Sequence, residues 1–176
     1  MEQKKTERIN RILTHPSYIE YVSQNAEKEQ DRVFCHHDMG HFLDVARLAE
    51  ILNLTEAYGQ DAELIYAAAL LHDIGRHIQY ETGEDHALVS ARMAPAILKD
   101  CGFMQEEAEQ IVSAIATHRL AEVRDRKDLN GLLYRADKLS RPCYCCKQES
   151  ACNWKGDKKN RQLIWQYIKT ATEAAG

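Results

Sequence analysis

The sequence has no apolar run approaching the roughly 18 residues needed to cross a membrane, and its first residues, Met1 to Asn10, are polar and contain lysine. It therefore shows neither a membrane-span nor a signal-peptide pattern, and we expect a soluble, cytoplasmic protein with no membrane partner. Charge of one sign is also scarce, because the net charge is −4 with 28% charged residues. Nothing global favours binding to a nucleic acid polymer, so any anionic substrate must be held by local groups.

Proline and glycine are scarce, with three and eight among 176 residues. Between them, apolar residues recur at spacings of three and four, which is typical of amphipathic helices, and no strand pattern or internal repeat competes. The chain is near the usual size of one domain and its hydrophobic content of 44% can supply a core. We predict an all-α, single-domain helical bundle over residues 1–176.

Two helices stand out in this pattern. Apolar residues from Phe42 to Leu52 form one stripe behind Asp38, which is placed to cap a helix ending near Asn53. The run Asp61–Leu71 is so apolar that we expect a central helix buried on nearly every side. Further helices are predicted at 15–30, 85–99, 105–117, 129–139 and 159–172.

A histidine and a carboxylate, His72 and Asp73, follow the buried run directly, and Gly75 is expected to let the chain turn away. A buried carboxylate is tolerated when it is paired or when a cation neutralises it, and His with Asp suits a divalent metal. His41 heads the apolar stripe of an earlier helix, and Asp137 lies on an otherwise apolar helical face. One cation held by these four residues explains all of them.

The ordered set His41, His72-Asp73 and Asp137 resembles the H…HD…D signature of the HD superfamily of metal-dependent phosphohydrolases, and Ile74-Gly75 extends it to the HDIG form. The resemblance spans residues 35–141. It implies a helical bundle with the metal between helices, in which the metal activates a water for attack on phosphorus.

Two further histidines, His86 and His118, lie at helix ends and complete an order similar to that of the binuclear branch, which includes bacterial hydrolases of diadenosine tetraphosphate. This resemblance implies that they hold a second metal and that Asp73, the central catalytic carboxylate, bridges the two ions. Mixed histidine and aspartate ligands favour one or two ions of iron, manganese, zinc, cobalt or nickel over magnesium or calcium.

His37, four positions before His41, resembles the catalytic histidine of cyclic-nucleotide phosphodiesterases and would donate a proton to the leaving oxygen. Cations near the motif are expected to bind phosphate oxygens. These candidates are Arg76, Arg119, Lys138 and Arg141, whereas Arg92 and Arg135 are interpreted as surface charges.

The six cysteines occur without a secretory pattern, so reduced thiols are expected rather than disulfides. Cys143, Cys146 and Cys152 lie in a predicted loop, 142–157, with ligand-like spacing. They indicate either a separate zinc or iron–sulfur site or a metal-free loop, since no second CxxC pair completes the usual pattern. Cys35 and Cys101 are expected to pack as small apolar residues, and residues 158–176 to form a C-terminal helix.

The favoured function is metal-dependent hydrolysis of a small phosphorylated substrate, a nucleotide or a related phosphate ester or anhydride. Two alternatives stay open. A few HD relatives are di-iron oxygenases, and a degenerate HD scaffold would bind a nucleotide as a non-catalytic sensor.

Overall fold

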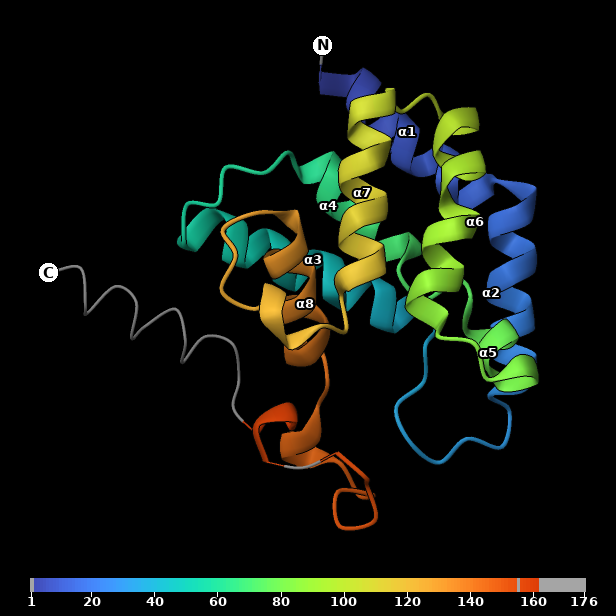
Figure 1. The fold of residues 1–176 in the computed structure, drawn as a ribbon, viewed down its shortest axis with the longest axis vertical. Helices are drawn as coiled ribbons and strands as arrows, with labels where there is room; N and C mark the ends of the chain where they lie inside the picture. Colours follow the sequence, from blue (N-terminus) through green and yellow to red (C-terminus); the bar gives the residue numbers. More distant parts are fainter. Residues whose placement is uncertain (1, 155, 162–176) are drawn as a thin grey trace, which may run out of the picture.

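The computed structural model describes residues 2–154 and 156–161, and within them it contains helices and no strand. The prediction of an all-α fold is therefore confirmed. No helix of this part of the chain is long and apolar enough to span a membrane. The helices, shown in Figure 1, are α1 (Glu2–Thr14), α2 (Pro16–Lys28), α3 (Met39–Thr55), α4 (Ala62–Leu71), α5 (Arg76–Thr82), α6 (His86–Cys101), α7 (Gln105–Thr117) and α8 (Leu129–Leu139), with 3₁₀ turns η1 (Ala121–Val123), η2 (Cys143–Cys145) and η3 (Gly156–Lys158).

Aspartate side chains begin four of these helices by accepting hydrogen bonds from backbone N–H groups that the helix itself leaves unpaired. Asp38, Asp61, Asp85 and Asp128 play this part for α3, α4, α6 and α8, with distances of 2.9–3.0 Å. Because each of these caps is followed by apolar periodicity, the predicted starts of these helices agree with the observed starts to within about two residues.

The helix α4 is the centre of the bundle, as its composition predicts. Residues Ala67 to Leu71 are fully buried, and α4 packs against α1, α3, α7 and α8. Because most of α4 is shielded from water, with Ala62 exposed and Tyr66 half-buried as the exceptions, it needs no polar stripe. It ends at the level where α3 and α6 begin and α7 ends, so that polar side chains at these helix ends can converge (Figure 1).

Two helices were not anticipated. The helix α1 has a polar N-terminal part, but Ile12 is fully buried in the core and Ile9 and Leu13 pack beside it. The helix α5 has only seven residues, from Arg76 to Thr82, too few to show a helical period. This short helix is important for the site because it brings Arg76 and Gln79 beside the end of α4.

Gly75 is required for a reason other than the expected one. Its φ of −88° is open to any residue. An added Cβ, however, would lie 2.6 Å from Cγ1 of Val89 and 2.8 Å from the backbone nitrogen of Ser90. The absent side chain therefore lets α6 approach the turn, where the Ser90 hydroxyl accepts a hydrogen bond from the Gly75 N–H at 2.9 Å.

The segment after α8 lies at the same end of the molecule as the loop between α2 and α3 (Figure 1). Asn160 Nδ2 donates to the Leu139 carbonyl at 2.6 Å, and Lys159 Nζ donates to the Glu149 carbonyl at 2.7 Å, so the segment is tied to α8 and to itself. The predicted C-terminal helix is not seen at 159–161, which are non-helical. Its remaining residues, 162–176, lie outside the described part.

Gly131→Ala is predicted to destabilise the fold by about 3 kcal/mol, because a Cβ there would collide with the Arg126 carbonyl and lie 2.8 Å from that of Val123. The matched control is Gly59→Ala, which meets no atom but keeps a φ of +70° and should cost only about 1 kcal/mol. Urea unfolding followed by circular dichroism measures both. Equal losses would contradict the collision.

Candidate metal centre

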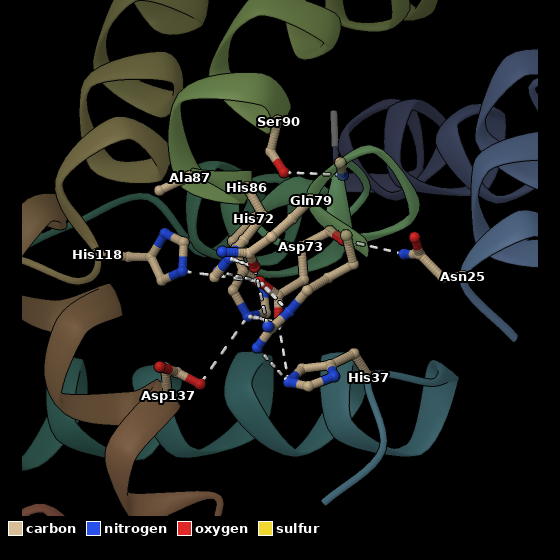
Figure 2. A network of polar contacts seen from close by, with 12 residues as sticks. Asn25, His37, His72, Asp73, Gln79, His86, Ala87, Ser90, His118 and Asp137 are labelled. Carbon is tan, nitrogen blue, oxygen red and sulfur yellow. Dashed lines mark hydrogen bonds and ion pairs between the residues drawn. The ribbon is translucent and has the colours of Figure 1, made fainter. Parts of the chain in front are cut away.

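Asp73 is the hub of a cluster of buried histidines at the end of α4 (Figure 2). Its Oδ2 lies 3.3 Å from His72 Nε2 and 3.7 Å from His41 Nε2. Its Oδ1 lies 3.0 Å from His86 Nε2 and 3.7 Å from His118 Nε2. Each carboxylate oxygen therefore faces its own pair of imidazole nitrogens.

Five helices supply these groups. His41 lies in the first turn of α3, His72 ends α4, His86 begins α6 and His118 ends α7. From α8, Asp137 Oδ1 lies 3.5 Å from His41 Nε2 and 4.0 Å from His72 Nε2. All six residues predicted as metal ligands are thus brought together.

The cluster divides into two potential ligand sets that share Asp73. One contains His41 and His72, the other His86 and His118, and in each set the ligand atoms lie within 4.8 Å of one another. Asp137 stands beside the first set. The same two sets are expected from the resemblance to binuclear HD proteins, in which Asp73 is the ligand common to both ions.

The rings of His72 and His118 are each oriented by a hydrogen bond to a backbone carbonyl of the preceding helix. In each, Nδ1 lies 2.7 Å from the carbonyl three residues earlier, Ala69 and Ile115 respectively. A carbonyl only accepts, so Nδ1 carries the proton and Nε2 presents a lone pair. A histidine directly after a helix thus obtains its tautomer from the last carbonyls of that helix.

Side chains hold the other two rings. His86 Nδ1 donates to Gln79 Oε1 at 2.6 Å. His41 Nδ1 lies 3.2 Å from the Ser140 hydroxyl, which donates its own proton to the Asp137 carbonyl and so accepts from the ring. Such partners fix ring orientation and raise the basicity of the ligating nitrogen.

The resulting arrangement fits a metal. Nε2 lone pairs face the carboxylate of Asp73 across 3.0–3.7 Å, which is repulsive unless a cation lies between them or a ring gains a second proton. Moreover, His72 Nε2 and Asp73 Oδ1 are buried atoms without a hydrogen-bond partner. Unpartnered buried polar atoms are costly, and a divalent ion satisfies both.

Charge and burial act in opposite directions on these groups. Burial disfavours the charge on Asp73, but His72 and Arg76 hold the pKa of this carboxyl well below its usual range. Burial likewise opposes the charge on Asp137, whose pKa Lys138 and Arg141 keep low.

Burial lowers the pKa of His118 to about 3. At His72 burial also opposes the charge, but Asp73, Asp137 and the Ala69 carbonyl together outweigh it and raise the pKa of that imidazole. The cluster thus offers two charged carboxylates. Because its pKa is low, His118 is a neutral imidazole, which is the form that binds a metal.

His37, the predicted proton donor, lies at the edge of the cluster. Its Nδ1 is 2.5 Å from Glu29 Oε1, and its Nε2 contacts the Arg76 guanidinium and lies 3.8 Å from Asp73 Oδ2. Burial lowers the pKa of His37 to about 3, below the near-neutral pKa that a proton donor needs. The location agrees with the prediction, and its catalytic role stays a prediction.

The predicted phosphate-binding cations line one cavity of about 530 Å³ that opens over Asp73. Arg141 donates to Asp137 Oδ1 at 3.0 Å, and Lys138 also contacts this carboxylate. The remaining cations are Arg76, Arg119 and Arg32, of which the sequence did not single out Arg32. Arg92 and Arg135 are not among the lining residues. Arg92 is exposed and pairs with Glu84, as expected of a surface charge. Arg135 instead is half-buried and donates to Glu56 and to the Tyr58 hydroxyl, so it is a structural cation rather than the expected surface charge.

Asn25 is a supporting residue that the sequence analysis missed. Its Nδ2 donates to the Asp73 carbonyl at 2.9 Å and its Oδ1 accepts from the His77 N–H at 2.7 Å, which holds the turn after α4 (Figure 2). The signal was a polar residue in an apolar stripe, seven positions after the buried Tyr18. Glu29, Gln79 and Ser140 were also missed, and no local pattern marks them.

Comparison with known proteins agrees with this geometry. The HD domain family model matches residues 38–141. An uncharacterized protein of Clostridium beijerinckii is 44% identical over 161 residues, covering 90% of this chain and 99% of that protein. A crystal structure of a predicted HD superfamily hydrolase from an uncultured Thermotogales bacterium aligns with a TM-score of 0.57 at 24% identity, covering 89% of this chain and 92% of that one.

Ribonuclease Y proteins match over shorter stretches. The enzyme of Rubrobacter xylanophilus is 34% identical over 80 residues, 46% of this chain and 14% of that enzyme. The enzyme of Oleidesulfovibrio alaskensis is 30% identical over 126 residues, 72% of this chain and 22% of that enzyme. This chain thus spans less than a quarter of either.

The chain belongs to the HD domain family, since the family model covers more than half of it. The class is that of metal-dependent phosphohydrolases, and the cluster around Asp73 is one that could hold the metal.

Asp73→Ala should abolish metal binding at this cluster while leaving helical content intact, because both ligand sets lose their common carboxylate. Loss of an outer partner alone lowers metal affinity by about 10–100-fold, so loss of the shared ligand should cost at least that. Isothermal titration with Mn²⁺ and far-UV circular dichroism measure the two properties. The control is Asp44→Ala, an exposed carboxylate on α3. Metal binding by Asp73→Ala at wild-type affinity would refute the assignment.

Proposed function

We propose that this chain is a binuclear phosphohydrolase that acts on a nucleotide or a related phosphate ester or anhydride. The observation that carries the proposal is the position of Asp73, whose two oxygens face separate histidine pairs beneath a cation-lined cavity. The likeness of this residue order to diadenosine tetraphosphate hydrolases supports the same substrate class.

In this proposal His41, His72 and Asp137 would hold one ion and His86 and His118 the other, with Asp73 as a ligand that both sets share. Ions bound in this way lower the pKa of a coordinated water and screen the phosphoryl oxygens. Histidine and carboxylate ligands suit iron, manganese, zinc, cobalt or nickel. The Nδ1 hydrogen bonds described above keep each ring aimed at its ion throughout the reaction.

The cavity fits a small phosphorylated molecule. Its volume of about 530 Å³ is typical of small-ligand pockets. Its lining includes Asp73, His86 and His118, which we take as the floor. Arg76, Arg119 and Lys138 also line it and could bind phosphate oxygens, and Phe34 and Trp154 supply aromatic surfaces. We infer that phosphate lies at the floor and that a base or other apolar group contacts the aromatic wall.

His37 is placed to act on the leaving group. Glu29 accepts from its Nδ1 and from the backbone N–H of the same residue, which leaves Nε2 directed toward Asp73 and the cavity. Burial lowers the pKa of His37 to about 3 and Nε2 contacts the Arg76 guanidinium, so the role requires that bound phosphate draw Arg76 away and raise this pKa. Once protonated at Nε2, His37 would donate that proton to the leaving oxygen. Glu29 would then orient the ring and stabilise its positive charge.

RNA is a second candidate substrate, favoured by the relatives named ribonuclease Y. The same cluster would serve phosphodiester cleavage, since the nucleophile and the attacked phosphorus are of the same kind. Comparing a dinucleoside polyphosphate, mononucleotides, cyclic dinucleotides and a single-stranded RNA in one assay separates these substrates.

The other two alternatives have distinct outcomes. A di-iron oxygenase would consume oxygen with an organic substrate, and a sensor would bind nucleotide without forming product. Hydrolysis of a nucleotide by the metal-loaded chain under anaerobic conditions, detected by chromatography as new nucleotide products or free phosphate, supports the proposal. Its failure with every substrate and every metal named above would reject it.

His118→Ala should reduce the Mn²⁺ stoichiometry from two ions per chain to one, because it removes a ligand from one set and leaves the other complete. Manganese is the probe because thiolates do not select it. Equilibrium dialysis measures the stoichiometry, and His36→Ala, an exposed histidine outside both sets, is the control. One ion in the wild type would contradict the binuclear site.

Arg119→Ala should raise KM about tenfold with little change in kcat, because a charged hydrogen bond to substrate phosphate is lost. The control is Arg92→Ala. Both arginines form exposed ion pairs, Arg119 with Asp85 at 2.6 Å and Arg92 with Glu84 at 2.7 Å, but only Arg119 lines the cavity. Steady-state kinetics on the best substrate distinguishes them, and equal effects would remove Arg119 from substrate binding.

A further inference from the structure

Four of the six cysteines gather beside the cavity from two separate segments. Cys35 lies in the connection between α2 and α3, whereas Cys143, Cys146 and Cys152 lie after α8. Cys35, Cys143 and Cys152 line the cavity over Asp73, and Cys143, Cys145 and Cys146 line a neighbouring hollow. Cys101, by contrast, is buried in the core as expected, and all six are free thiols.

The backbone turns tightly at the first of these cysteines. At the end of η2 the Cys146 N–H donates to the Cys143 carbonyl at 3.4 Å, and both residues line the same hollow. Cys145 lines that hollow too, but it is exposed and its Sγ donates to the Pro142 carbonyl at 3.5 Å. We therefore take Cys143 and Cys146, and not Cys145, as the candidate ligands.

Burial and the neighbouring thiols keep Cys143 protonated in the absence of a cation. Burial raises the pKa of the Cys143 thiol, and ionised Cys35, Cys146 and Cys152 would raise it further. A bound cation would remove the repulsion among these thiolates and displace the thiol protons.

The sulfur atoms are not drawn into a closed site. Among the described residues, the ligand sets whose atoms all lie within 4.8 Å of one another are the two around Asp73. Residues 142–154 are largely turns with exposed or half-buried side chains. Contraction of this segment around an ion therefore disrupts little packing.

We propose that Cys35, Cys143, Cys146 and Cys152 form a thiolate site for a thiophilic metal centre, a zinc ion or an iron–sulfur cluster, separate from the centre at Asp73. Four thiolates are the usual ligand set of structural zinc and of such clusters. The spacing from Cys143 to Cys152 supplies three ligands, and Cys35 supplies the fourth that the sequence pattern lacks.

This site would fasten one wall of the cavity. Cys35 is two residues before His37, and Cys152 is two residues before Trp154, whose ring lies 5.7 Å from the Arg141 guanidinium and 5.7 Å from Lys138 Nζ. A metal centre joining the two segments would fix the proton donor and the aromatic wall relative to each other.

Metal content is the first test. The full chain is purified under reducing, anaerobic conditions, and zinc, iron and acid-labile sulfide are measured per chain for the wild type and for Cys143→Ser and Cys145→Ser. We expect Cys143→Ser to lose one zinc, or one cluster with its sulfide, and Cys145→Ser to retain it. Sulfide together with iron identifies a cluster, and zinc without sulfide identifies the single ion. Equal metal content in all three proteins would overturn the proposal.

Cobalt(II) provides a readout specific to sulfur. Thiolate-to-cobalt charge-transfer absorption cannot come from the histidines and aspartates at Asp73. We expect it in the apo wild type titrated with Co²⁺, with affinity weakened about tenfold or more in Cys35→Ser and Cys152→Ser and unchanged in Cys145→Ser. Circular dichroism and retained Mn²⁺ binding at Asp73 verify folding. No charge-transfer band in the wild type would reject the site, and wild-type affinity in Cys35→Ser would reject the four-residue composition.

Discussion

The charge of Asp73, directly after a helix whose last five residues are apolar and fully buried, is the constraint around which this molecule is organised. A carboxylate in such surroundings is stable only if cationic groups or a metal compensate it. The chain meets this requirement with side chains from α3, α5, α6 and the end of α7, and it holds the backbone of the same residue through Asn25. The short helix α5, the close approach of α6 at Gly75 and the position of Arg76 all follow from building this one turn.

The supporting hydrogen bonds explain how a helical bundle makes a rigid centre from helix ends. Carbonyls that end α4 and α7 are unpaired within their helices, and they receive the Nδ1 protons of His72 and His118. The same bonds therefore satisfy the helix termini and select the tautomer of the ligands. At these two helix ends, one hydrogen bond therefore both pairs a terminal carbonyl and orients a candidate metal ligand.

Much of this could be predicted from the sequence, for physical reasons that differ by element. The helices α3, α4, α6 and α8 combine aspartate caps with sustained apolar periodicity, and α7 shows the periodicity without such a cap, so their bounds follow closely. His41, Asp137 and the HD pair stand out because they are polar groups at apolar positions. The partners Glu29 and Gln79 could not be found, because they act through contacts between distant segments and occupy ordinary polar positions. For the same reason the sequence assigned Cys35 to packing, although it lines the cavity.

The origin of the ligands in five separate helices has a consequence for folding. An ion that joins His41 to Asp137 would close nearly one hundred residues of chain into loops, as a cross-link does. While it stays bound, it would lower the conformational entropy of partly unfolded states and so favour the folded state. None of the cysteines is joined in a disulfide, so no covalent bond does this work. Metal binding and the stability of the bundle would therefore be coupled. Removal of the ion should destabilise the helix ends around Asp73 first and the hydrophobic core only afterwards.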